Sequence, residues 1–110
     1  MGKKAVSCPA ETALHILEGR WKLLILRALF TGTKRFGELH RLLAGVSHRT
    51  LTQQLRELAG YGLVHRKVYP QVPPKVEYSL TALGQTLKPV IDAMHDWAET
   101  HGRTIRLKRT

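Results

Sequence analysis

Cysteine, acidic side chains and long apolar runs are scarce in this 110-residue chain. A single cysteine, Cys8, cannot form an intramolecular disulfide, which excludes a disulfide-stabilised scaffold and zinc sites built from several thiolates. The longest aliphatic run, Leu23 to Leu26, is far shorter than the roughly 20 apolar residues that a membrane-spanning helix needs. We therefore expect no membrane span. The N-terminus carries no secretory or lipidation signal, so we expect a cytoplasmic protein.

Recognisable catalytic and metal-binding motifs are also missing. The chain contains no HExxH, no GxSxG and no phosphate-cradling glycine loop, and its basic half has no clustered carboxylates. His95 and Glu99 could face one another on a helix, but that spacing is more typical of a solvated face than of a metal site. We therefore expect neither an enzyme nor a bound metal or cofactor.

The residues present in excess are the positively charged ones. Eighteen Lys and Arg against eight Asp and Glu give a formal net charge of +10. Segment 31–75 has eight basic residues against two acidic ones, whereas segment 76–100 has one lysine against four acids. A basic composition can simply keep a protein soluble. This separation of charge along a short chain nevertheless favours a polyanionic partner, and nucleic acid is the first choice.

Glycine, proline and capping residues divide the first half of the chain into periodic segments. Ser47 is a good N-cap for a helix in which Leu51, Leu55 and Leu58 share one face, and Gly62 suits the position just beyond its end. Shorter apolar repeats precede it. Together the patterns predict helices over residues 9–18, 21–30, 36–44 and 48–61.

After Gly62 the hydrophobic period changes from 3.6 to 2, over 64–69 and again over 76–80, with a proline-rich break between them. This pattern predicts a hairpin. Thr81 can then cap one long final helix, which Pro89 should kink without ending. Apolar residues at heptad spacing favour a dimer interface over a ligand-lined face. The expected interface residues are Leu83, Leu87, Val90, Ile91, Met94 and Trp97.

Helices followed by a hairpin and a long helix are the plan of a winged helix-turn-helix protein. We therefore predict a mainly α, α+β winged helix-turn-helix domain with a two-stranded β-hairpin wing and a long C-terminal dimerisation helix. The length and the 43% hydrophobic content are typical of one compact domain. We expect this single domain to span residues 1–110, with its core at about 8–100 and tails at 1–7 and 103–110.

If the leucines of the fourth predicted helix face inward, side chains that can bind bases face outward. Arg can contact guanine through a bidentate fork, Gln can contact adenine in the same way, and Thr can bind phosphate or a thymine methyl. Cations of the hairpin and before the third helix would hold phosphates on either side. A solvated amphipathic helix would have the same polar face, so the flanking cations decide for DNA. The expected DNA-binding residues are Lys34, Arg35, Ser47, His48, Arg49, Thr50, Thr52, Gln53, Arg56, Lys67 and Lys75.

Ordered motifs over roughly residues 8–100 resemble the HxlR family of bacterial and archaeal transcriptional regulators. The resemblance implies a MarR-like winged-helix fold, a homodimer, and operator binding by the helix after Ser47 and by the wing. Gly60, late in that helix, departs from the family pattern without affecting a contact residue. The matching motifs are Cys8-Pro9, Gly19-Arg20-Trp21-Lys22-Leu23-Leu24-Ile25-Leu26, Arg35-Phe36-Gly37-Glu38-Leu39, Leu51-Thr52-Gln53-Gln54-Leu55-Arg56-Glu57-Leu58, Gly62-Leu63-Val64, Val72-Pro73-Pro74-Lys75-Val76-Glu77-Tyr78 and Leu80-Thr81-Ala82-Leu83-Gly84.

The resemblance also draws attention to Cys8, because several members of this family use a cysteine in this Cys-Pro setting to sense oxidants or electrophiles. The dipole of the following helix and the nearby Lys3 and Lys4 should favour its thiolate form. A lone cysteine can equally be a small unreactive apolar residue. Oxidation could link Cys8 to Cys8 of a partner subunit or cap it with a small thiol.

Two function classes remain open at this stage. One is a sequence-specific transcriptional regulator, a homodimer that reads a pseudo-palindromic operator in double-stranded DNA and responds to oxidants through Cys8. The other is an architectural protein that binds DNA without sequence preference. Arg49 and Gln53 favour the regulator, because an architectural protein does not need side chains capable of bidentate base contacts.

Overall fold

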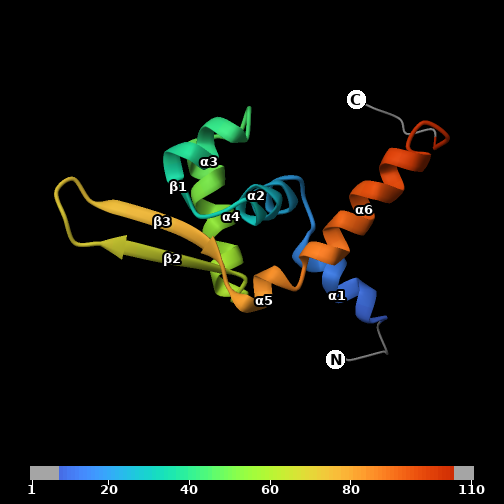
Figure 1. Ribbon diagram of the computed structural model, residues 1–110, viewed down its shortest axis with the longest axis horizontal. Coiled ribbons are helices and arrows are strands. Elements are labelled where there is room, and N and C mark those ends of the chain that lie inside the picture. Colours follow the sequence, from blue (N-terminus) through green and yellow to red (C-terminus); the bar gives the residue numbers. More distant parts are fainter. Residues whose placement is uncertain (1–7, 106–110) are drawn as a thin grey trace.

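The computed structural model describes residues 8–105. Its helices and strands follow the order expected of a winged helix-turn-helix, with the hairpin extending from one side of the helical body and the last helix projecting from the other (Figure 1). No helix in the described segment is long and apolar enough to span a bilayer. The elements are α1 (Pro9–Ile16), α2 (Trp21–Phe30), β1 (Lys34–Arg35), α3 (Phe36–Leu42), α4 (His48–Gly60), β2 (Val64–Tyr69), β3 (Lys75–Leu80), α5 (Ala82–Gln85) and α6 (Lys88–His101).

Both ends of α4 have the caps that the sequence predicts. The Ser47 hydroxyl accepts a hydrogen bond at 3.0 Å from the backbone N–H three residues further on. At the other end Gly62 has a positive φ of 79°. Gly62 and Leu63 donate to the carbonyls of Ala59 and Leu58 at 3.0 and 3.1 Å, which is the Schellman arrangement. The boundaries of α4 are therefore fixed by local hydrogen bonds.

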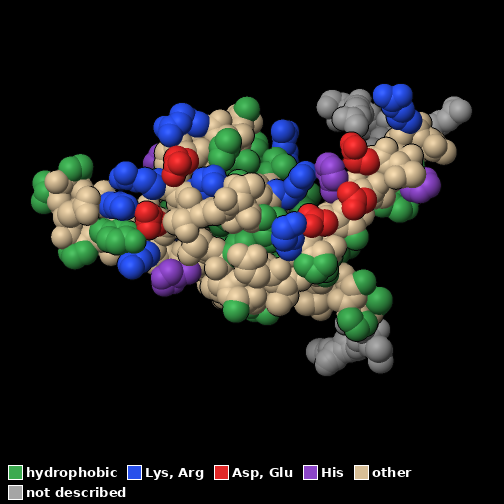
Figure 2. Space-filling model, viewed as in Figure 1, with side chains coloured by type: hydrophobic (Ala, Val, Ile, Leu, Met, Phe, Trp, Pro, Cys, Tyr) green, Lys and Arg blue, Asp and Glu red, His purple; other side chains and the backbone are tan. Residues whose placement is uncertain are grey.

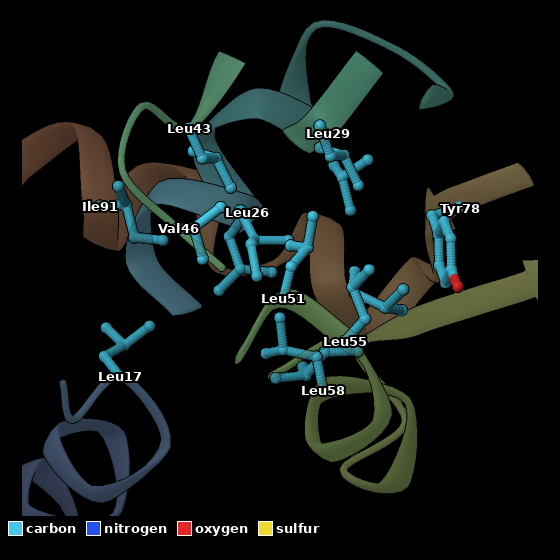
Figure 3. Packing of buried hydrophobic residues seen from close by; sticks show 14 residues of the cluster. Leu17, Leu26, Leu29, Leu43, Val46, Leu51, Leu55, Leu58, Tyr78 and Ile91 are labelled. Atoms are coloured by element: carbon cyan, nitrogen blue, oxygen red, sulfur yellow. The ribbon is translucent and has the colours of Figure 1, made fainter. Parts of the chain in front are cut away.

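The core lies where α4 packs against α2 (Figure 3). Leu51, Leu55 and Leu58 are at most 2% exposed, and Leu26 of α2 is fully buried among them. Leu17, just after α1, extends the same cluster. Burying one such side chain contributes roughly 1.5 to 3 kcal/mol, so these contacts hold α4 with its leucine face inward.

The sheet contains a third strand that the sequence analysis did not predict. Strand β1 pairs antiparallel with β3, with Lys34 opposite Tyr78 and Arg35 opposite Glu77, and the strand order is β1-β3-β2. The prediction of a two-stranded wing is therefore incomplete, because a strand of two residues is too short to show an alternating pattern. The pairing attaches the segment before α3 to the base of the wing.

The prediction of one continuous final helix is wrong. Helix α5 ends at Gln85, and α6 begins at Lys88 with Pro89 in its first turn. Proline lacks a backbone N–H and is well tolerated in the first turn of a helix. The residue expected to kink a helix therefore lies at the start of a new one.

Burial divides the predicted interface residues into two groups. Ile91 is 1% exposed and lies in the core, and the partly buried Leu87 packs against it. Ile91 thus belongs to the core and is not a free surface residue. The exposed members of the predicted interface are Leu83, Val90, Met94 and Trp97.

A close backbone approach joins α5 to the start of the wing. The Thr81 hydroxyl accepts from the Gly84 N–H at 3.0 Å and donates to the Gly62 carbonyl at 2.6 Å. The Thr81 N–H also donates to the Leu63 carbonyl at 3.0 Å. A Cβ atom on Gly84 would overlap the same Leu63 carbonyl oxygen. This position therefore has no room for any side chain.

We expect Gly84→Ala to lower the free energy of unfolding by about 1 to 3 kcal/mol, because the added methyl group must displace backbone. Gly60→Ala is the matched control. No atom lies within contact distance of a Cβ at that position, and alanine in a helix should stabilise the protein by roughly 0.5 to 1 kcal/mol. Urea unfolding followed by circular dichroism measures both changes. Equal effects of the two substitutions would contradict the proposed overlap.

Candidate nucleic-acid interface

The outward face of α4 forms one continuous polar surface, which we call the α4 face. Because the leucines face inward, the residues on the opposite side of the helix face solvent. The side chains that line a single open depression there are His48, Arg49, Thr52, Gln53 and Arg56. The sequence analysis named all five, and the structure places them side by side.

The remaining predicted residues of this helix serve its N-terminus. The hydroxyl of Ser47 accepts from the Thr50 N–H, so both are part of the cap. The Thr52 hydroxyl donates to the His48 carbonyl at 2.8 Å, within the helix. A helix N-terminus attracts anions, because its first N–H groups point outward and carry partial positive charge. These residues suit a phosphate contact better than a base contact.

His48 is oriented by aromatic side chains of α3. Its ring centroid lies 4.6 Å from that of Phe36. His40 lies nearby, and its Nε2 is 3.0 Å from the Val46 carbonyl oxygen. Since a carbonyl can only accept, this Nε2 carries a hydrogen. The turn between α3 and α4 is thereby held against α3, and the first residue of α4 is fixed with it.

An ion pair between the buried Lys22 and the partly exposed Glu57 lies behind the α4 face, and the sequence patterns did not predict it. Lys22 lies in the apolar run of α2, and its side chain is only 8% exposed. Its Nζ is 2.5 Å from Glu57 Oε1 and 2.9 Å from Gln54 Oε1. A lysine within an apolar run was the available signal, but its partners are more than 30 residues away in the sequence.

This contact controls the charge of the α4 face. Glu57 is the only carboxylate in α4, and it also accepts a hydrogen bond from Gln53 Nε2 at 3.0 Å. The hydrogen bond from Lys22 is the main cause that lowers the pKa of Glu57, followed by the bond from Gln53 and the charge of Lys22. The carboxylate therefore stays ionised, and the lysine ammonium compensates its charge.

The cations of the wing are arranged around Tyr69. Lys67 Nζ and Lys75 Nζ lie 4.9 and 4.6 Å from the centre of its ring. The Tyr69 hydroxyl donates to Glu77 Oε1 at 2.8 Å, and this bond is the main cause that lowers the pKa of Glu77. Lys75 is half-buried and 3.5 Å from the same carboxylate, whereas Lys67 is exposed. Lys67 is therefore the wing lysine best placed for a phosphate.

The two predicted cations before α3 also differ in exposure. Lys34 is partly buried, and its Nζ donates to the Thr31 hydroxyl at 2.9 Å. Arg35 is exposed at the base of the wing. Figure 2 shows Lys and Arg side chains over the wing and the helical body, with acidic side chains along α6 and others among the cations of the wing and near α3. The charge separation seen in the sequence is thus only partly a separation in space, because Glu77 lies beside Lys75 on the wing.

Cys8 is exposed and is the N-cap residue of α1. Its carbonyl accepts from the Glu11 N–H at 2.8 Å, and its side chain makes no capping bond. Lys3 and Lys4, which the sequence analysis placed near the thiol, lie outside the described residues. Within residues 8–105 no group of three or more His, Cys, Asp or Glu side chains could hold a metal ion.

We expect Glu57→Gln to reduce the free energy of unfolding at pH 7 and this difference to shrink in acid. The ordinary pKa of glutamate is about 4.3, and the pKa of Glu57 is lower in the folded state. The ionised carboxylate therefore stabilises the fold at pH values above about 4.3, and this stabilisation is lost as the pH falls through the folded-state pKa. Urea unfolding at pH 7 and pH 3 measures the difference. Glu99→Gln, which removes an exposed carboxylate without an ion pair in the described segment, should have no effect at either pH. A difference for Glu57→Gln that persists unchanged at pH 3 would contradict the expectation.

Comparison with known proteins agrees with this arrangement. The family model described as HxlR-like helix-turn-helix matches residues 16–106. The HTH-type transcriptional regulator YdeP of Bacillus subtilis is 54% identical over 94 residues, which cover 86% of this chain and 73% of YdeP. The solved structure of the redox regulator HypR in its oxidised form has a TM-score of 0.79 and 48% identity, covering 84% of this chain and 96% of HypR.

A MarR-family transcriptional regulator from Porphyromonas gingivalis W83 is similar over a comparable length. Its structure has a TM-score of 0.81 and 38% identity, covering 90% of this chain and 97% of that one. The family model covers most of the chain, and the two solved structures share its fold. The chain therefore belongs to the HxlR-like helix-turn-helix family.

Proposed function

We propose that this protein is a sequence-specific transcriptional regulator that binds a pseudo-palindromic operator as a homodimer and responds to oxidants. At the level of its family it is a DNA-binding transcriptional regulator of the HxlR and MarR-like type. The observation that carries the finer proposal is the α4 face. Five polar side chains line one open surface of a single exposed helix, and its one carboxylate is neutralised from behind.

The α4 face suits the major groove in size and chemistry. A helix with its side chains is about 10 to 12 Å wide, and the major groove is about 12 Å wide. Arg49 is exposed and makes no ion pair or side-chain hydrogen bond within residues 8–105, so its guanidinium can contact guanine O6 and N7. The exposed Lys67 of β2 and Arg35 of β1 would bind the phosphate backbone.

Exposed apolar side chains of α5 and α6 support the proposal of a homodimer. Val90, Met94, Leu83 and Trp97 are between 42% and 56% exposed. Met94 also borders an apolar groove between α2 and α6. Val90, Met94 and Trp97 follow one another at helical spacing along one face of α6, and several exposed apolar side chains on one face are typical of an interaction surface. A two-fold dimer through this surface would place two α4 helices on half-sites about one DNA turn, roughly 10 bp, apart.

The oxidant response is proposed for Cys8. The residue is exposed at the N-terminus of α1, and its side chain makes no capping hydrogen bond, so the thiol is accessible to a reagent. The solved relative named redox regulator HypR, at 48% identity, supports a redox role. The family resemblance implies a dimer in which α1 lies beside the last helix of the partner subunit, and in such a dimer an adduct or disulfide at Cys8 would change the separation of the two α4 helices.

We expect Arg49→Ala to cost roughly 1 to 3 kcal/mol of binding to the operator and to relax base preference at one position per half-site. Lys67→Ala should instead weaken binding to all sequences about equally. It should also reduce the slope of log binding constant against log salt concentration by about one. Fluorescence anisotropy with operator and random duplexes at several salt concentrations separates the two effects. Equal, sequence-independent losses for both variants would favour an architectural DNA-binding protein.

We expect Trp97→Glu to produce monomers, because it places a charge in an apolar interface where the partner offers no compensation. Analytical ultracentrifugation at micromolar concentration measures the change. Leu42→Glu is the matched control, because Leu42 is 58% exposed on α3, away from α6. A Trp97→Glu variant that remains dimeric and binds the operator normally would show that the interface lies elsewhere.

We expect diamide or a quinone to change the operator affinity of the parent protein and to leave that of Cys8→Ser unchanged. Because the chain has a single cysteine, any thiol-dependent response must pass through this residue. Operator binding before and after oxidation, with mass spectrometry of the product, measures the response. If Cys8→Ser responds like the parent protein, the thiol is not the sensor.

A further inference from the structure

The side-chain amide of Gln53 is held in one orientation by a residue one turn further along α4. Its Nε2 donates to Glu57 Oε2 at 3.0 Å. An ionised carboxylate can accept hydrogen bonds but cannot donate them. The NH₂ end of the amide must therefore face Glu57, and the carbonyl oxygen Oε1 must point away from it. Within residues 8–105 this oxygen has no hydrogen-bond partner.

Glu57 is itself held in place from the core. Lys22 Nζ binds its other oxygen, Oε1, at 2.5 Å, and the lysine side chain is buried between α2 and α4. If Glu57 turned away, the buried ammonium would keep only the carbonyl oxygen of Gln54 as an acceptor. Leaving a buried charged donor without its partner is costly, so the carboxylate stays where it is. A chain of three side chains thus connects the core to the α4 face.

We propose that Gln53 selects bases that carry an exocyclic amino group, and that Lys22 and Glu57 are the positioning residues that impose this choice. In the major groove adenine N6 and cytosine N4 are donors, whereas guanine O6 and thymine O4 are acceptors. The free carbonyl oxygen of Gln53 accepts from the first pair and is repelled by the second. Adenine or cytosine therefore occupies the position that Gln53 contacts. This inference rests on the proposed sequence-specific function.

The chain offers a substitution that should reverse this preference. In Glu57→Gln the buried Lys22 ammonium still requires an acceptor, so the introduced carbonyl oxygen faces Lys22 and the introduced NH₂ group faces Gln53. The Gln53 amide must then turn its own oxygen inward and its NH₂ group toward the DNA. That group donates to guanine O6 or thymine O4. Glu57→Ala instead removes the orienting group and should leave both amide orientations accessible.

The experiment is selection from a random-sequence duplex pool by the full-length parent protein and each variant. Gln53→Ala identifies the contacted position as the one where base preference disappears. We expect adenine or cytosine there for the parent protein. Glu57→Gln should shift the ratio of amino to keto bases at that position by about threefold to tenfold, and Glu57→Ala should bring the ratio close to one. Gln54→Ala is the matched control, because it also removes a Lys22 contact but should leave this position unchanged.

The outcomes separate the inference from the function on which it rests. If the parent protein enriches no sequence, the proposed sequence-specific function itself fails. If it enriches a motif, the inference is overturned by guanine or thymine at the Gln53 position, or by a Gln53→Ala variant that changes no position. An unchanged ratio in both Glu57 variants, or an equal change in Gln54→Ala, also overturns it. Circular dichroism and binding to random duplex show whether each variant is folded. If Glu57→Gln does not fold, the loss of base preference expected for Glu57→Ala still tests the inference.

Discussion

The packing of one face of α4 against α2 is the constraint on which the rest of the structure depends. Leu51, Leu55 and Leu58 are buried together, and the 3.6-residue period then places the five residues of the α4 face on the outward side of the helix. The same contacts that stabilise the fold therefore present the α4 face to solvent. Rotation of the helix about its axis would bury arginine and expose leucine. It would therefore destabilise the fold and remove the polar surface at the same time.

Lys22 connects this packing to the chemistry of the surface. A buried lysine needs acceptors, and both of its acceptors, Glu57 and Gln54, lie on α4. The requirement fixes the rotation of α4 a second time, now through hydrogen bonds with defined geometry. It also neutralises the one carboxylate of α4, which would otherwise repel phosphate. A single charged side chain in the core thus stabilises the helix pair and adjusts the electrostatics of its far face.

The wing and the exposed apolar face of α6 depend on features that join distant segments. Strand β1 ties the residues before α3 to β3, so the cations at the base of the wing move with the hairpin. Tyr69 sets the two wing lysines apart by holding Glu77 next to Lys75. On the other side of the molecule, Ile91 anchors α6 to the core and leaves the opposite side of that helix exposed. Each surface is therefore rigidly attached to the same core.

The sequence by itself determined the features whose signals lie within one helical turn or one period of the hydrophobic pattern. The order of the first four helices and the hairpin, the caps of α4 at Ser47 and Gly62, and the five residues of the α4 face all follow from local spacing. Each of these signals lies within a few neighbouring residues. For the same reason the family resemblance could be recognised from short motifs.

Only the tertiary structure decided the features that depend on contacts between distant segments. Strand β1 exists because β3 pairs with it, and the Lys22 contacts join residues 32 and 35 positions apart. The final helix breaks before Lys88, which allows Ile91 to reach the core, although its heptad spacing alone is compatible with an intersubunit seam. Pairing, burial and the satisfaction of a buried charge are properties of the folded chain, and periodicity along the sequence does not contain them.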